Sequence, residues 1–243
     1  GRLAATLEEM RAELRARDRQ LQEMLAGIAH EVRNPLGGMA LTAGLLAEDL
    51  ASEPERAAHV RRIRREIDHL TRLVNDFLDF AREAPPRLEA LPAAALLEEV
   101  AHHARAEAAA REIAVAVRAA PVRLRCDPGL VRRALLNLSR NAVQASAPGA
   151  TVDLEAEADG AGVVLRVIDR GPGIPPEVAE RIFEPFFTTR EKGTGLGLAF
   201  ARRIAEAHGG ALVHRPTPGG GATFEMRLPA AGAAARDAAA AAG

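Results

Sequence analysis

Two successive apolar series constrain the fold of this chain more than any other feature. The first runs through residues 28–50 and the second through residues 60–81, each with steps of three and four, and the polar sequence ASEPER separates them. This spacing predicts two helices that form an antiparallel hairpin. A lone hairpin cannot cover two apolar stripes. We therefore expect two copies to join as a homodimer with a four-helix bundle.

Patterns on either side of the hairpin divide the chain further. A heptad-like seam in residues 1–25 predicts a coiled-coil signalling helix. Three prolines in APPRLEALP predict that residues 85–92 are a linker. The expected parts are a coiled coil (1–25), the hairpin (26–84), the linker (85–92), a second domain (93–229) and a low-complexity tail (230–243).

The second domain alternates helical and strand patterns. Helices are expected at residues 93–111, 128–147 and 195–209, and strands at residues 113–118, 121–126, 151–158, 162–169, 211–215 and 222–228. This order predicts an α/β layer arrangement with a mixed sheet. The fold class is therefore α plus α/β.

The composition argues against nucleic acid as a partner and favours a reducing cytoplasm. The formal net charge is −1, so we expect no binding to nucleic acid. The single cysteine, Cys126, cannot form an internal disulfide and fits a reducing cytoplasm. No apolar run is long enough to span a membrane. We expect a soluble cytoplasmic fragment of a longer protein, whose membrane attachment the sequence does not fix.

The segment GIAHEVRNPL, residues 27–36, places a histidine on the first helix of the hairpin. His30 lies between the apolar positions 28 and 32, so its ring is expected to face outward. A neutral imidazole can act as a nucleophile, and the adjacent Glu31 is a candidate general base. Asn34 follows one turn later and could position a water molecule. An ordinary solvated histidine is the alternative.

Three clusters of residues in the second domain have side chains or backbone groups that could bind parts of a nucleotide. Asn137 and Asn141 lie four residues apart on one helix, and an amide oxygen is a suitable ligand for Mg²⁺. Asp169 ends an apolar strand and could accept a hydrogen bond from an exocyclic amine. The sequence GTGLGL at residues 193–198 puts glycines just before a helix, where backbone amides favour phosphate. Taken alone, the two asparagines could instead be helix caps or surface residues. The glycine-rich segment alone could be a plain turn.

Taken in order, five clusters resemble the motifs of sensor histidine kinases. HEVRNPL resembles their H box, and NLSRNAVQA, DRGPGI, FEPFFTTR and GTGLGL resemble their N, G1, F and G2 boxes. The match runs from about residue 25 to residue 229. The resemblance implies a dimerisation and histidine-phosphotransfer domain, followed by a Bergerat-type α/β sandwich that binds ATP and Mg²⁺.

The resemblance also implies a role for each site residue. His30 is expected to be the phosphoacceptor and Asn34 to support a phosphatase activity. Asn141 would coordinate Mg²⁺, and Asp169 would hold the adenine amino group. The remaining cofactor-binding residues are expected to be Asn137, Arg140, Gly171, Gly173, Arg190, Lys192, Gly193, Thr194, Gly195, Leu196 and Gly197. The implied partners are a response regulator receiver domain and an upstream sensor domain.

Two other functions remain as alternatives. Hydrolysing ATPases of the gyrase, heat-shock and mismatch-repair types resemble the same domain but carry a glutamate where this chain has Asn137. An amide cannot accept the proton of an attacking water molecule, so hydrolysis is disfavoured. A nucleotide-binding scaffold without phosphate transfer is the second alternative, although all the motif residues are present. Transfer within one chain and transfer across the dimer both remain open.

Overall fold

The computed structural model describes residues 6, 10, 27–28, 31–81, 85–160, 162–190 and 193–230. The chain forms two compact units, residues Gly1–Ala84 and Pro85–Gly243. Most of the expected coiled coil (1–25) and nearly all of the expected tail (230–243) lie outside the described residues. Among the helices that are described, none is both long and apolar enough to cross a membrane.

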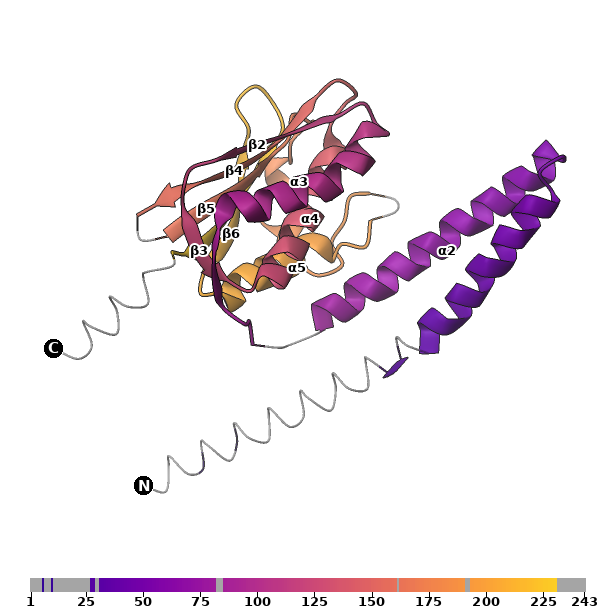
Figure 1. The fold of residues 1–243 in the computed structure, drawn as a ribbon, viewed down its shortest axis with the longest axis horizontal. Coiled ribbons are helices and arrows are strands. Elements are labelled where there is room, and N and C mark those ends of the chain that lie inside the picture. The colour runs from indigo at the N-terminus through magenta and orange to yellow at the C-terminus, as the bar shows by residue number, and fades with distance from the viewer. Residues whose placement is uncertain are drawn as a thin grey trace. The chain divides into compact units, whose positions relative to one another are not determined.

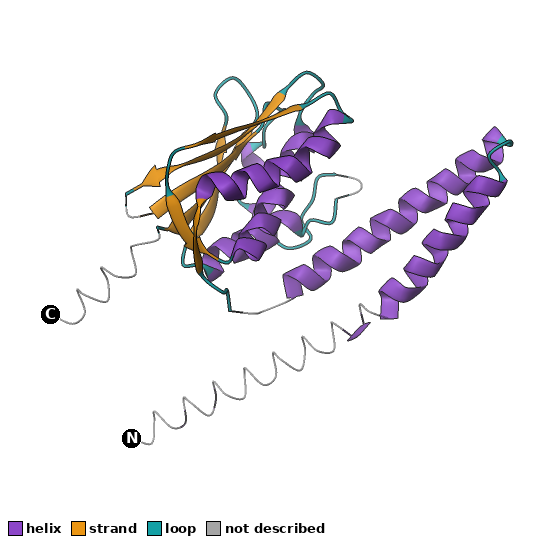
Figure 2. Ribbon diagram, viewed as in Figure 1, coloured by secondary structure: helices purple, strands orange, loops and turns teal. Residues whose placement is uncertain are grey.

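The first unit is the expected helical hairpin (Figures 1 and 2). One helix covers residues 31–49, and α2 covers Pro54–Ala81. Pro54 suits the first helical position because the missing amide hydrogen has no partner there. Leu36, Ala43, Val60 and Ile67 are buried between the two helices. Arg33 Nη2 also donates to Asn75 Oδ1 at 2.9 Å across the hairpin.

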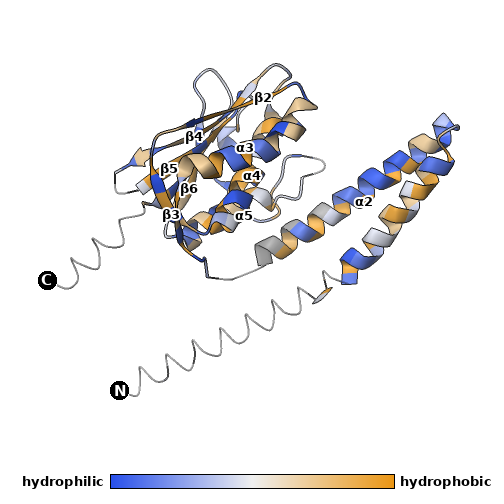
Figure 3. Ribbon diagram, viewed as in Figure 1, coloured by the Kyte–Doolittle hydropathy of each residue, from blue (hydrophilic) through white to orange (hydrophobic). Residues whose placement is uncertain are grey.

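A second apolar seam on the hairpin has no partner among the described residues. Apolar residues recur along both helices (Figure 3), but only part of each series is buried by the other helix. The exposed members follow heptad spacing: Val32, Met39 and Leu46 on the first helix, and Ile63, Leu70 and Phe77 on α2. Each helix therefore has one stripe that closes the hairpin and one that is left open.

The second unit is an α/β sandwich with one helical layer. Its sheet has the strand order β2-β4-β5-β7-β6, in which β2 and β4 are parallel and the other neighbours are antiparallel. The strands are β2 (Ala114–Ala119), β4 (Thr151–Asp159), β5 (Gly162–Ile168), β6 (Ala211–Pro216) and β7 (Ala222–Pro229). Figure 1 shows α3 (Ala93–Ala109), α4 (Pro128–Ala145) and α5 (Gly197–Ala207) together on one face. The mixed sheet confirms the predicted fold class.

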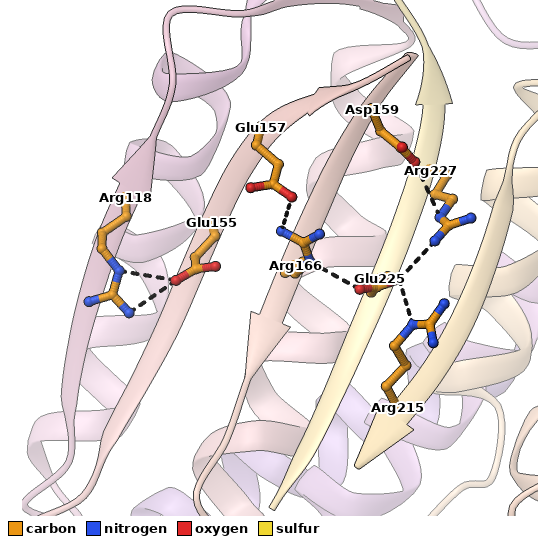
Figure 4. Close-up of polar contacts among 8 residues, drawn as sticks. All are labelled: Arg118, Glu155, Glu157, Asp159, Arg166, Arg215, Glu225 and Arg227. Carbon is orange, nitrogen blue, oxygen red and sulfur yellow. Dashed lines mark hydrogen bonds and ion pairs between the residues drawn. The ribbon is translucent and has the colours of Figure 1, made fainter. Parts of the chain in front are cut away.

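Alternation along the strands separates the two faces of the sheet. The side that faces the helices holds buried residues such as Leu154, Leu165 and Met226. The other side carries arginines and carboxylates that pair within a strand and between strands (Figure 4). Glu225 is the centre of this network, because it contacts Arg166, Arg215 and Arg227.

One strand was missed by the sequence prediction. Residues Glu89–Pro92, expected as part of a linker, form β1 and pair antiparallel with β3 (Arg123–Cys126). Two short 3-10 helices, η1 (Pro176–Val178) and η2 (Arg181–Phe183), follow β5 and lead to the glycine-rich segment before α5. The other helices and strands lie within a few residues of their predicted positions.

Candidate functional site

Asp169 follows the last residue of β5 and is held there by the backbone of β7. The Asp169 N–H donates to the Ala222 carbonyl at 2.9 Å. Its Oδ1 accepts from the N–H groups of Gly171 and Ala222, at 2.9 and 3.0 Å. Oδ2 takes part in neither of these two bonds. The residue is only 3% exposed, so a carboxylate is fixed in orientation in a largely dry environment.

Glycines beside Asp169 allow close backbone contacts that a side chain would prevent. A Cβ on Gly171 would lie 2.6 Å from the Ala145 carbonyl oxygen at the end of α4. Gly173 has a φ of +77°, which favours glycine, and a Cβ there would lie 3.2 Å from the Gly221 oxygen. The turn after β5 therefore packs against α4 and the start of β7 only because both residues lack side chains.

Asn137 and Asn141 face the first residue of α5. A Cβ on Gly197 would lie 3.8 Å from Asn137 Cβ and 4.0 Å from Asn141 Nδ2. The four-residue spacing on α4 places both amides on this side. The N-terminus of α5, where unpaired amides favour anions, thus lies beside two neutral amide groups.

Arg190 connects the segment before α5 to the end of α4. Its Nη1 donates to Asn141 Oδ1 at 3.1 Å and to Gln144 Oε1 at 2.8 Å, and Nη2 donates to the Asn141 carbonyl at 3.2 Å. Burial lowers the pKa of Arg190, while the charge of Asp169 acts in the opposite direction. A guanidinium group therefore lies at the amide oxygen that the resemblance gives to Mg²⁺.

The segments FEPFFTTR and GTGLGL are joined through their backbones. The Phe186 N–H donates to the Gly195 carbonyl at 3.0 Å. Gly195 has a φ of +68°, and a Cβ there would lie 2.4 Å from the Phe186 carbonyl carbon. Thr194 Oγ1 accepts from the Leu196 N–H at 3.2 Å. The Leu196 side chain is buried, so this residue can offer only its backbone to a ligand.

Gly193 is also shaped by a close contact. Its N–H donates to the Arg190 carbonyl at 3.1 Å. A Cβ on Gly193 would overlap Thr188 Oγ1. A side chain at residue 193 would therefore require Thr188 to move, whereas one at residue 195 would meet the Phe186 backbone.

For several residues of the sequence prediction, the described contacts do not test the predicted role. Arg140 lies on α4, but its Nε is 3.4 Å from Glu107 Oε2 on α3. Its phosphate contact therefore stays a prediction, as do the roles of Glu31 and Asn34, which are exposed on the first helix of the hairpin. His30 and Lys192 lie outside the described residues.

The structure adds residues that the sequence prediction missed. Gln144 makes the shortest of the three Arg190 contacts, and its position three residues after Asn141 could have indicated this. His214 lies beside Phe224, with ring centroids 5.6 Å apart. Its Nε2 is buried without a hydrogen-bond partner among the described residues. Burial lowers the pKa of His214, and Asp169 opposes this effect. No sequence signal pointed to His214.

The arrangement suits a purine nucleotide. A buried carboxylate can accept from an amino group, and a glycine-rich helix start can hold phosphates. Neutral amide oxygens nearby can ligate a hard cation. The fold and site together define a nucleotide-binding α/β domain of the Bergerat type, covalently linked to a helical hairpin.

Comparisons with known proteins agree with this assignment. Residues 126–232 match the family described as histidine kinase-, DNA gyrase B-, and HSP90-like ATPase. Residues 20–85 match the His Kinase A (phospho-acceptor) domain. The sensor histidine kinase ZraS of Salmonella typhi is 35% identical over 209 residues, which are 85% of this chain and 45% of that protein. The sensor protein KdpD of Escherichia coli is 33% identical over 94% of this chain and 26% of its own length.

Solved structures give the same result. Full-length ShkA in complex with AMPPNP has a TM-score of 0.70 and 38% identity, over 86% of this chain and 46% of that one. The histidine kinase ThkA in complex with the response regulator TrrA has a TM-score of 0.64 and 26% identity, over 86% of this chain and 61% of that one. The chain belongs to the two-component sensor histidine kinases and contains their catalytic core. It spans less than half of the length of the two curated relatives.

Proposed function

We propose that this chain transfers the γ-phosphoryl group of ATP to His30 and then to an aspartate of a separate response regulator. The observation that carries the proposal is the pairing of two modules in one chain. The phospho-acceptor match includes residue 30, and the ATPase match includes Asp169, Asn141 and Gly197.

The site residues have distinct roles in nucleotide binding. Asp169 would accept a hydrogen bond from the adenine amino group, since its Oδ1 is already held by two backbone amides. The amides before α5 would bind phosphate oxygens. Asn141 would hold Mg²⁺, with Asn137 beside it, and bound Mg²⁺ would neutralise charge on the phosphates. Arg190 would leave Asn141 Oδ1 and pair with a phosphate.

The transfer itself needs a nucleophile from the hairpin. A ring nitrogen of neutral His30 would use its lone pair to form a bond to the γ-phosphorus, while the bond from that phosphorus to the bridging oxygen of ADP breaks. Glu31 would accept the hydrogen of the other ring nitrogen and stabilise the charge that develops on the ring. An aspartate of the regulator would then take the phosphoryl group from His30. Phosphatase support by Asn34 stays a prediction.

A homodimer is part of the proposal. The open seam of the hairpin, from Val32 to Leu46 and from Ile63 to Phe77, repeats every seven residues. A second copy of the hairpin offers the same apolar surface, and joining the two seams completes a four-helix bundle. The complex of ThkA with TrrA supports a response regulator as the further partner.

Labelling with γ-³²P-ATP tests the proposed function. We expect wild-type protein to retain label in an acid-labile, alkali-stable form, as a phosphohistidine would. His30→Gln should bind ATP normally and retain no label. His59→Gln, a change at another histidine of the hairpin, is the matched control and should label like wild type. Undiminished labelling of His30→Gln, or release of the label as inorganic phosphate only, would contradict the proposal.

A further inference from the structure

Asp127 joins three segments of the ATPase domain. It is the N-cap of α4, where its Oδ1 accepts from the Leu130 N–H at 3.0 Å. Its Oδ2 accepts from the backbone N–H of Arg87 at 3.0 Å. Its own N–H donates to Nε2 of His208 at the end of α5, at 2.9 Å. We call Arg87, Asp127 and His208 the Asp127 junction.

Arg87 belongs to the connector through which the chain enters the ATPase domain. It lies two residues before β1, whose four residues pair with β3. Arg123 Nη2 on β3 also donates to the Ala90 carbonyl of β1 at 3.0 Å. The Asp127 carboxylate therefore holds the connector just before the sheet pairing begins.

His208 fixes the other side of the junction. The residue is 6% exposed, and its Nδ1 lies 2.7 Å from the Ile204 carbonyl. A carbonyl can only accept, so Nδ1 carries the hydrogen and Nε2 is free to accept from Asp127. Both ring nitrogens of a neutral histidine are thus used to tie the end of α5 to the start of α4.

The same two helices hold the nucleotide site at their other ends. Asn137 is ten residues beyond Asp127 on α4, which is about 15 Å along a helix. Gly197, the first residue of α5, lies beside Asn137 and Asn141. The junction therefore links the connector to the remote ends of both site helices.

We propose that Asp127 is a positioning residue for phosphoryl transfer, because its carboxylate fixes the connector from the hairpin to the two helices that hold the nucleotide. The inference rests on the proposed function. Transfer to a histidine of the hairpin depends on how the ATPase domain is placed, and small errors in placement slow such reactions strongly. The contacts of the connector given above involve none of the residues that we propose for nucleotide binding.

Two substitutions remove the connector contact from opposite sides. Asp127→Asn keeps an oxygen for the Leu130 N–H, and asparagine is as good an N-cap as aspartate. Its NH₂ group cannot accept from Arg87. Arg87→Pro removes the donor and leaves Asp127 unchanged. Arg87→Ala keeps the N–H and is the matched control, because it removes only the side chain.

We expect Asp127→Asn and Arg87→Pro each to slow His30 labelling at saturating ATP by about fivefold. ATP affinity should stay within about twofold of wild type in every variant. Arg87→Ala should label like wild type, and the double variant should be no slower than either single variant. A labelling rate unchanged in both single variants, or a matching loss of ATP affinity, would overturn the proposal.

Amide hydrogen exchange separates this inference from the proposed function. The Arg87 amide should be protected in wild type and exchange faster in Asp127→Asn. If wild-type protein does not label at all, the proposed function is wrong, and so is a positioning role in it. If wild type labels and the Arg87 amide is unprotected, only the Asp127 junction is wrong.

Discussion

Arg190 donates a hydrogen bond to Oδ1 of Asn141 at 3.1 Å, the oxygen that we propose for Mg²⁺. Two cations cannot share this oxygen closely without repulsion, so Mg²⁺ bound at this oxygen would require the guanidinium to move. Triphosphate oxygens nearby offer Arg190 a new partner. The contact between Arg190 and Asn141 therefore shows that a positive charge is favourable at Asn141 Oδ1.

Replacing Asn141 should separate metal binding from nucleotide binding. We expect Asn141→Ala to weaken ATP binding by about tenfold or more in the presence of Mg²⁺, and much less in EDTA, because only the ligand of the cation is lost. Calorimetric titration in both buffers measures the difference. Asn75→Ala, in the hairpin, is the control and should bind ATP like wild type. An equal loss in both buffers would refute Asn141 as the metal ligand.

Alanine at Gly195 should damage the site more than alanine at another glycine with positive φ. Gly195→Ala introduces both a strained φ and an overlap with the Phe186 backbone. Gly149, with a φ of +81°, has nothing within 4 Å of its Cβ position. Gly149→Ala should therefore cost only about 1 kcal/mol of unfolding free energy. Fluorescent ATP analogues should bind weakly to Gly195→Ala and normally to Gly149→Ala. Normal binding to both would contradict the proposed loop geometry.

Glu225 should make stability depend on pH. Burial tends to raise the pKa of Glu225, but its bonds and charge interactions with Arg166 and Arg215 outweigh burial and lower the pKa. A lowered carboxyl pKa stabilises the fold above the unfolded value of about 4, and this stabilisation disappears as the pH falls through the folded pKa. We expect Glu225→Gln to lose roughly 1–3 kcal/mol at pH 7, since its partners are partly exposed.

Urea unfolding at several pH values checks this expectation. The difference between wild type and Glu225→Gln should shrink as the pH is lowered below about 4. Glu157→Gln is the comparison, because its half-exposed carboxylate contacts one arginine, Arg166, among the described residues. Its loss should be under about 1 kcal/mol. A pH-independent difference for Glu225→Gln would mean that packing and not charge is responsible.

The Cys126 thiol should be inert in the folded protein. It is fully buried on β3, and burial raises its pKa to about 12. Because the thiolate is the reactive form, we expect no reaction with a thiol reagent such as DTNB at pH 8 in native protein. One thiol per chain should react in denaturant. Rapid labelling of native protein would show that the β1–β3 pair opens readily.

Charge on the open seam of the hairpin should prevent dimer formation. Ile63 is 53% exposed in the single chain, and a dimer would bury it. We expect Ile63→Glu to yield monomers in sedimentation measurements, whereas Arg64→Glu, one position off the seam, should leave the dimer intact. Dimers of both variants would show that the open seam is not the interface.

The sequence predicted elements with clear periodicity well and missed what depends on long-range contacts. The strand β1 contains a proline and follows two others, so it read as a linker. Its partner β3 lies more than 30 residues away. Similarly, nothing local in the sequence indicates that Arg190 reaches Asn141, 49 residues earlier, or that Asp127 contacts both Arg87 and His208.

Phe186 shows a different limit of sequence reasoning. A phenylalanine beside a glycine-rich segment would be expected to pack beneath it, yet Phe186 is 63% exposed and has a φ of +67°. Its backbone, and not its ring, makes the close contact with Gly195. An apolar side chain in a sequence motif is read as core, because the sequence does not reveal a left-handed backbone at a non-glycine residue.

On the face of the sheet opposite the helices, charged side chains already pair with one another (Figure 4). Four arginines (Arg118, Arg166, Arg215 and Arg227) pair with four carboxylates (Glu155, Glu157, Asp159 and Glu225), so the formal charges of this network cancel. Most of these partners lie on the same strand or the neighbouring one, and Arg227 also reaches Asp159 two strands away. A protein that docked on this face would exchange existing ion pairs for new ones, so the face offers a partner little net electrostatic gain. In the proposed transfer, this face of the sheet would therefore compete little with the approach of the ATPase domain to His30.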